Sequence, residues 1–343
     1  MDVRLLKHYN SELHFMREMG AEFAHSFPKV AARLGIENEQ CADPYVERLL
    51  EGFAFLTARV QLKIEEEFPK FCQQLLSMVY PDYLAPRPSM AVVHLAPDPN
   101  DSNGDGFLLE RGTMLRSGLG AEMLTSCEYS LAQDVTLYPI KVAQAEYLGN
   151  RASLARLGIQ PNREVAAGIR IEFETLGGTD IGELNLDELP LYLAGTGDIP
   201  LWVYEQILNY KCGYSVITGS KEDTRVTDLP VDDVRRKGFD SDEAMLNYRS
   251  RSFDTYRLLQ EYFAFPERFR FINFCGLKRP LKAASGERFE LVIHLSERMA
   301  DLENVVDKGN FLPFCAATVN LFRKRCDRIH LDDRTFEYHI VPD

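Results

Sequence analysis

One run in this sequence has the residue types and spacing of a calcium-binding loop. Asp101-Ser102-Asn103-Gly104-Asp105-Gly106 places side-chain oxygens at its first, third and fifth positions and a glycine at its sixth, the pattern by which helix-flanked loops hold calcium. Such loops take a bidentate glutamate at the twelfth position, where this chain has Gly112, and Glu110 stands two residues early. The flanking residues favour strands instead of helices. We therefore interpret the run as a solvated hairpin loop.

A second set of residues could support nucleophilic catalysis, which needs a thiol or hydroxyl beside a histidine and an orienting acid. Cys275, His294 and Asp307 supply these types. Cys275 and His294 each stand in an apolar, strand-like run, where a buried thiol and a hydrogen-bonded core imidazole are usual. No metal-ligand spacing occurs among the other histidines, which are His8, His14, His25, His94, His330 and His339. The residues alone predict no catalytic, cofactor-binding or metal site.

Cysteine and glycine patterns exclude further classes of protein. The seven cysteines are odd in number and form no C-x-x-C pair, which fits neither a disulfide framework nor a structural zinc site and suits the cytosol. Gly118-Leu119-Gly120 and Gly195-Thr196-Gly197 each lack the third glycine of a nucleotide-binding loop. We expect both glycine pairs to form turns.

The composition is that of a soluble, folded protein. Of 343 residues, 45% are hydrophobic and 27% charged, which is enough apolar material for a packed core. The formal net charge of -13 would repel the phosphates of a nucleic acid. No apolar stretch has the length of a membrane helix, and the first ten residues lack a signal-peptide core. We expect a cytoplasmic protein with no nucleic-acid partner and no membrane insertion.

The first part of the chain, before the candidate loop and the candidate nucleophilic residues, is predicted to be helical. An amphipathic helix is predicted by apolar residues spaced by three, four and seven, which are Leu6, Tyr9, Leu13, Met16 and Phe23. Further helices are expected from Pro28 to Gly35, after the N-cap Asp43, and around 71–78. Three prolines between positions 81 and 88 then fix an extended path. We predict a helical domain over residues 1–83, and its first apolar face could pack internally or bind a partner helix.

Beyond residue 84 the repeat of apolar residues changes from about 3.6 residues, which is typical of a helix, to 2 residues, which is typical of a strand. This alternation predicts a β-rich region over residues 84–343, and we also consider its division into two subdomains near residue 230. Short strands are expected over 90–95, 108–115, 169–173, 269–274, 289–295 and 318–322. Two helices interrupt them, at 198–210 with Leu201, Tyr204 and Leu208 inward, and at 255–265. The predicted fold class is α+β. A dense group of aromatics should be mostly core, with a partner surface as the alternative for part of it; the group is Tyr256, Tyr262, Phe263, Phe265, Phe269, Phe271 and Phe274.

Several runs in this order resemble the TssF family of type VI secretion baseplate subunits, also called VasA or ImpG. The most specific are Cys41-Ala42-Asp43-Pro44-Tyr45-Val46-Glu47-Arg48-Leu49-Leu50-Glu51-Gly52-Phe53-Ala54-Phe55-Leu56 and Tyr256-Arg257-Leu258-Leu259-Gln260-Glu261-Tyr262-Phe263-Ala264-Phe265-Pro266-Glu267. Shorter runs are His8-Tyr9-Asn10, Gly238-Phe239 with Asp242-Glu243-Ala244, Val319-Asn320-Leu321-Phe322 and Val341-Pro342-Asp343. Family members continue past the last of these, so the C-terminal part of the family is expected to be absent here.

The resemblance implies a structural subunit and no enzyme, with no cofactor. Its implied partners are TssG, TssK, TssE and a second TssF copy in the baseplate wedge. The assembled baseplate surrounds the VgrG spike, docks on the membrane complex at the inner membrane of a Gram-negative bacterium, and templates the contractile sheath. The helices of residues 1–80 are then expected to bind a partner helix. The alternative, kept open by the residues themselves, is a free-standing cytosolic ligand-binding or thiol-dependent hydrolytic protein.

Overall fold

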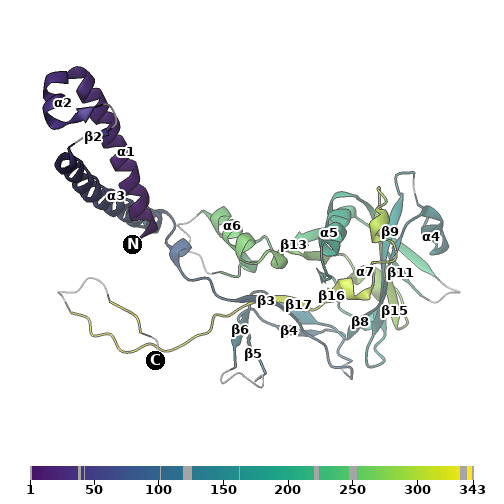
Figure 1. The fold of residues 1–343 in the computed structure, drawn as a ribbon. Coiled ribbons are helices and arrows are strands. Elements are labelled where there is room, and N and C mark those ends of the chain that lie inside the picture. Colours follow the sequence, from purple (N-terminus) through teal and green to yellow (C-terminus); the bar gives the residue numbers. More distant parts are fainter. Residues whose placement is uncertain are drawn as a thin grey trace. The chain divides into compact units, whose positions relative to one another are not determined.

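The computed structural model divides the chain into two compact units, Met1–Ala85 and Pro86–Asp343 (Figure 1). It describes residues 2–37, 40, 41, 43–100, 102–118, 126–161, 163–219, 224–246, 253–332 and 338–341. The first unit is helical, and strands dominate the second. The fold is therefore α+β, as the change of apolar period predicts.

The first unit is a pair of helices joined by short elements. Its elements are α1 (Val3–Ser26), α2 (Pro28–Leu34), β1 (Ile36–Glu37), β2 (Gln40–Cys41), α3 (Pro44–Val79) and the 3-10 turn η1 (Pro81–Leu84). The Asp2 carboxylate accepts from the Arg4 N–H, and the Asp43 carboxylate from the Tyr45 N–H, so each long helix begins at an acidic cap. Gly35 ends α2 in the left-handed conformation.

The helix α3 runs unbroken through the region where the sequence suggests two helices. Pro69 lies inside it, although proline removes one backbone hydrogen bond and usually kinks or ends a helix. Every residue from 63 to 75 is exposed, so water can solvate the carbonyl that Pro69 leaves unpaired. The prediction of a separate helix around 71–78 is therefore wrong.

The second unit is built from short strands. Its strands are β3 (Met90–His94), β4 (Phe107–Leu109), β5 (Met114–Arg116), β6 (Glu128–Leu131), β7 (Val135–Leu137), β8 (Ile140–Leu148), β9 (Ala167–Thr175), β10 (Leu189–Leu193), β11 (Lys211–Thr218), β12 (Arg225–Leu229), β13 (Val234–Lys237), β14 (Phe271–Phe274), β15 (Arg288–Leu295), β16 (Phe311–Pro313) and β17 (Cys315–Val319). The last strand lies earlier than predicted and ends at Val319, although the Asn320 N–H still donates to the Ser89 carbonyl beside β3.

These strands form sheets with antiparallel pairing. The orders are β12-β11-β15-β9-β8, β13-β14-β10-β16 and β3-β17-β6-β5, and β4 pairs with β7. The main core lies between the first two sheets and contains Ile169, Ile171 and Phe173 of β9 with Leu191 of β10. Because β10 pairs with β14 and β11 with β15, strands from both sides of residue 230 share sheets. No break between sheets falls at that residue.

Four helices accompany the described strands, namely α4 (Arg151–Arg156), α5 (Ile199–Asn209), α6 (Asp254–Ala264) and α7 (Lys278–Lys282), with 3-10 turns η2 (Ile181–Glu183), η3 (Val231–Asp233), η4 (Ser241–Glu243), η5 (Pro266–Phe269), η6 (Ala300–Leu302) and η7 (Lys308–Asn310). The sequence predicts α5 and α6 and misses the short α4 and α7. In α5 the inward residues are Val203, Gln206 and Ile207, whereas Leu201 is 48% exposed. The inward placement of Leu201 is a wrong prediction, because Leu201 lies on the side of α5 opposite the buried Pro200, Val203 and Ile207.

Candidate interaction surfaces

The residues that could form a nucleophilic site do not contact one another. Cys275 follows β14 and receives a hydrogen bond from the Asn273 amide at 3.4 Å, and burial raises the pKa of its thiol to about 11. Asp307 accepts from the Gly309 N–H at the start of η7. At neutral pH the Cys275 thiol keeps its proton, which disfavours the thiolate that a hydrolytic mechanism needs.

His294 instead belongs to a small polar cluster with Ser215 and Asp228, in which Ser215 and His294 are buried and Asp228 is exposed. The Ser215 hydroxyl donates to Asp228 Oδ1 at 2.6 Å and lies 3.2 Å from His294 Nε2. Because the single hydroxyl proton points to Asp228, His294 donates to Ser215 in this arrangement. That direction is the reverse of the one in which histidine removes a proton from a nucleophilic serine. The cluster thus satisfies buried polar groups between β11, β12 and β15.

The described part of the acidic loop forms a turn. Asn103 Oδ1 accepts from the Asp105 N–H, its amide donates to the Gly106 carbonyl, and Gly106 has a φ of 78°. Asp101, the first position of the suspected calcium loop, lies outside the described residues. Among the described residues, no group of three or more His, Cys, Asp or Glu side chains could hold a metal ion.

The first unit is held together by close packing and ion pairs between α1 and α3. Ala54 and Ala58 are fully buried, which lets the two helix backbones approach. His8 lies 2.7 Å from Glu65, and Arg17 lies 2.5 Å from Glu47. Because the earlier residue of α1 meets the later residue of α3, the two helices are antiparallel.

The five predicted partner-binding residues of α1 divide between two environments. Tyr9, Leu13 and Met16 are half-buried, on the side of the helix that also carries His8 and Arg17 and therefore faces α3. Leu6 and Phe23 are 44% and 36% exposed. Only the last two are open to a partner while the helix pair stays closed.

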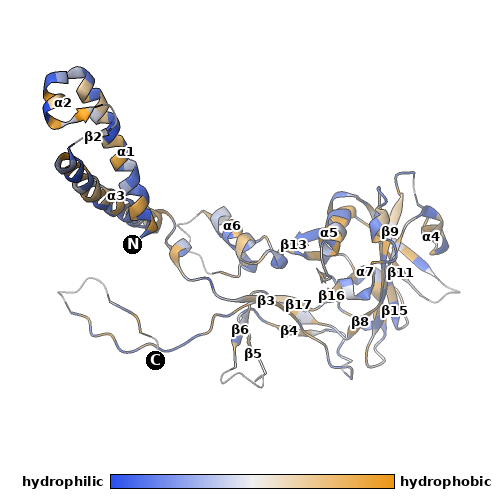
Figure 2. Ribbon diagram, viewed as in Figure 1, coloured by the Kyte–Doolittle hydropathy of each residue, from blue (hydrophilic) through white to orange (hydrophobic). Residues whose placement is uncertain are grey.

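A longer apolar surface runs along α3. Its members, which we name the α3 stripe, are Leu49, Phe53, Leu56, Val60, Ile64, Phe68, Phe71, Leu75 and Met78, each between 52% and 76% exposed. Their spacing of three or four residues puts them on one side of the helix, away from Ala54 and Ala58. At 1.5 Å per residue the stripe is about 44 Å long. Figure 2 shows hydrophobic residues along both long helices.

The helix α6 is amphipathic, but its polar side is buried and its apolar side is exposed. Arg257, Gln260 and Glu261 are buried, at 0%, 5% and 0% exposure. Its large apolar side chains are exposed instead, together with the preceding Phe253. This set, which we name the α6 face, is Phe253 (67%), Tyr256 (45%), Leu259 (51%), Tyr262 (54%) and Phe263 (75%). Of the predicted aromatic group, Phe269, Phe271 and Phe274 are buried and Phe265 is half-buried, whereas Tyr256, Tyr262 and Phe263 are exposed. For these exposed members the partner surface stays a prediction.

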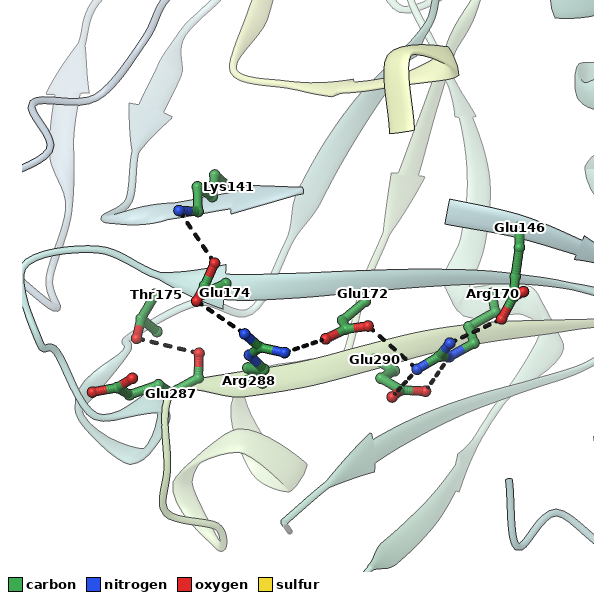
Figure 3. Close-up of polar contacts among 9 residues, drawn as sticks. All are labelled: Lys141, Glu146, Arg170, Glu172, Glu174, Thr175, Glu287, Arg288 and Glu290. Carbon is green, nitrogen blue, oxygen red and sulfur yellow. Dashed lines mark hydrogen bonds and ion pairs between the residues drawn. The ribbon is translucent and has the colours of Figure 1, made fainter. Parts of the chain in front are cut away.

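The open face of the five-stranded sheet carries a charged ladder (Figure 3). Arg170 lies between Glu146 and Glu290, at 2.8 Å and 2.5 Å, and also contacts Glu172. These carboxylates hold the pKa of Arg170 above its usual value. Arg288 and Lys141 continue the ladder to Glu174. With its charges paired, this part of the sheet presents a wet, polar surface.

Comparisons with known proteins place the chain among the components of the type VI secretion system. A family model described as "Type VI secretion system, TssF" matches residues 1–343, and the chain belongs to this TssF family. It is 49% identical to the type VI secretion system component TssF1 of Pseudomonas aeruginosa, over all of this chain and 55% of that protein. The chain thus spans about half the length of that relative.

A solved structure has a similar fold. It is the TssK-TssF-TssG baseplate subcomplex of the type VI secretion system determined by cryo-electron microscopy. The matching chain is 25% identical with a TM-score of 0.65, over 87% of this chain and 53% of that one. The similarity confirms the predicted family and the α+β arrangement of a helical region followed by sheets. Among the described residues, no helix has the length and apolar character needed to cross a membrane.

Proposed function

We propose that this chain is a structural subunit of the type VI secretion baseplate, binding TssG and TssK in the cytoplasm of a Gram-negative bacterium. Its family, and its likeness to a chain of a TssK-TssF-TssG subcomplex, support this role. The observation that carries the proposal is the α3 stripe. A solvent-exposed apolar seam of this length on one helix is typical of a helix that packs in a bundle.

We assign the stripe to TssG, as a partner that supplies one or more helices. Side chains spaced by three and four along α3 fit into the grooves of another helix. Burying an exposed Leu or Phe contributes on the order of 1.5–3 kcal/mol each, so even half of the stripe could hold a complex together. Leu6 and Phe23 of α1 add apolar area on the same unit.

The predicted α1 residues keep a role in this proposal, in a modified form. Tyr9, Leu13 and Met16 shape the α1–α3 pair that presents the stripe, and they would touch a partner helix only if the pair opened. We extend the proposal to the full baseplate role that the family resemblance implies. It includes TssE and a second TssF copy in the wedge, the VgrG spike at its centre, docking on the membrane complex, and templating of the sheath.

The test compares charged substitutions on and off the stripe at the same level of α3. Phe71→Asp with Leu75→Asp places two charges on the stripe, and Gln73→Asp with Ser77→Asp places two charges on exposed positions beside it. Each variant is co-expressed with a TssG-like chain and captured through a tag on that chain. We expect the stripe variant to lose capture at least tenfold and the control to keep it. Equal capture of both variants, with unchanged helix content by circular dichroism, would contradict the proposal.

A further inference from the structure

The short helix α7 carries three cations that no described residue neutralises. Lys278, Arg279 and Lys282 are exposed, and none of them makes an ion pair with a residue that the structure describes. Helix capping does not account for the group, because Lys278 lies at the positive end of the helix dipole and repels Lys282 four residues later. In a chain with a net charge of -13, this group is a local exception that an anionic partner would stabilise.

The core holds α7 with its cations facing outward. Leu277 and Leu281 are fully buried and belong to the main core of the second unit. Asp187 fixes the start of the helix, because its carbonyl accepts from the Leu277 N–H at 3.1 Å and its carboxylate from the Lys278 N–H at 3.4 Å. Turning α7 to hide its cations would break these contacts, so the basic side of the helix is held in place.

The helix α7 lies beside the strand β12, in the opposite direction. At the start of β12, Arg225 Nη1 donates to the carbonyl of Ala283, which directly follows α7, at 3.0 Å. At the end of β12, Leu229 lines a hollow together with Gly276, which precedes α7, and with Lys278. This hollow has a volume of about 590 Å³, within the range of about 300–1,000 Å³ typical of binding pockets.

The strand β12 has a free edge next to this basic helix. It is the last strand of the five-stranded sheet, and of the described strands only β11 pairs with it. The unpaired N–H and C=O groups of such an edge can bind an added strand. Arg225 and Leu229 lie on the face of β12 toward α7, whereas Asp228 lies on the opposite face, where it accepts from Ser215. An added strand would therefore meet cations on one face and a carboxylate on the other.

We propose that an extended segment of a partner protein, with acidic residues at alternate positions, pairs with the free edge of β12 and places its carboxylates on the cations of α7. Lys278 and Lys282 are separated by about 6 Å along the helix axis, and alternate residues of a strand by about 6.6 Å. Successive carboxylates on one face of the added strand can thus each meet a cation. This surface belongs to the second unit and the α3 stripe to the first, so the inference does not rest on the proposed function.

Two fluorescein-labelled peptides of identical composition test the contact by fluorescence anisotropy with the intact chain. One peptide alternates Glu and Thr, and the other has all its Glu residues before all its Thr residues. We expect the alternating peptide to bind at least tenfold more tightly, because only its carboxylates all lie on one face of a strand. Equal affinities would overturn the proposal. Displacement by inorganic phosphate or a single-stranded oligonucleotide as effective as that by unlabelled peptide would also overturn it, since the site would then select phosphate.

Matched variants of the chain locate the contact. We expect Lys278→Glu with Lys282→Glu to weaken binding of the alternating peptide at least tenfold. Lys324→Glu with Arg328→Glu makes the same change of charge at exposed positions after β17 and should alter the affinity less than twofold. Equal weakening by both would mean unspecific attraction and would contradict the proposal.

A neutral variant separates lost attraction from added repulsion. Lys278→Gln with Lys282→Gln removes two cations without introducing carboxylates, and we expect it to weaken binding of the alternating peptide at least fivefold. An unchanged urea midpoint, followed by the fluorescence of Trp202, shows that the variant is folded. Unaltered affinity of this folded variant would overturn the proposal. Capture by a TssG-like chain reports on the α3 stripe and tests the proposed function separately.

Discussion

Replacing Glu261 by Gln should strongly destabilise the second unit. The Glu261 carboxylate is fully buried, accepts two backbone N–H groups, and is paired with Arg257 and Arg268. Burial and the nearby Arg257 already lower the pKa of Arg268 to about 10. Glutamine keeps the size of the side chain and one acceptor oxygen but removes the only carboxylate that contacts both guanidinium groups in the described region.

The magnitude follows from the cost of an uncompensated buried charge. Removing one partner of a buried ion pair costs about 3–5 kcal/mol. For a unit of this size, 1 kcal/mol corresponds to about 2–4 °C in Tm, so we expect a decrease of about 6–20 °C.

Urea unfolding followed by tryptophan fluorescence measures the change, because the single tryptophan, Trp202, packs against the main core of the second unit. Glu267→Gln is the control, since Glu267 is partly exposed and lies 3.8 Å from Arg270. We expect the control to change the free energy of unfolding by less than about 0.5 kcal/mol. A loss below about 1 kcal/mol for Glu261→Gln would refute the reasoning that this cluster holds α6 in place.

Three further predictions concern packing and protonation. Burial lowers the pKa of His294 below its usual value of 6.5, so the unfolded chain binds the proton more readily and stability should fall as the pH decreases below about 6.5; urea midpoints at pH 7.5 and 5.5 should differ less in His294→Gln than in the parent. Ala58→Leu should force α1 from α3 and cost about 1–3 kcal/mol, seen as faster hydrogen exchange in α1, whereas exposed Arg59→Leu should not. Leu154→Ala should remove about 2–5 kcal/mol from the small core beneath α4, measured by the same urea assay, and a smaller loss would mean that this core contributes little.

The local patterns of the sequence predict much of the fold. Acidic caps at Asp43 and apolar spacing locate the long helices, and the alternation around Ile169, Ile171 and Phe173 locates a strand with one wet face. The single helix α3 replaces the two predicted helices, because an exposed helix with long flanks tolerates the backbone hydrogen bond that Pro69 removes. The short α4 and α7 lack a full helical period and could not be recognised in this way.

The surfaces are less predictable than the elements, because they depend on contacts between distant segments. Tyr262 and Phe263 have the hydropathy of core residues, and only the buried pairing of Glu261 with Arg268 turns them outward. Arg257 and Glu261 are four residues apart and so lie on the same side of α6. This spacing is the sequence signal that could have predicted an ion pair on that side of the helix. In the same way, Leu13 is half-buried because α1 packs antiparallel on α3, whereas the α3 stripe lies on another side of α3 and is exposed to solvent.

Co-expression of this chain with TssG-like and TssK-like chains, followed by size exclusion with light scattering, tests the baseplate assignment most directly. We expect one stable complex of defined mass that contains this chain together with the TssG-like chain. If this chain instead elutes as a soluble, folded protein that binds neither partner at micromolar concentration, the claim that the described surfaces make it a baseplate subunit would be contradicted.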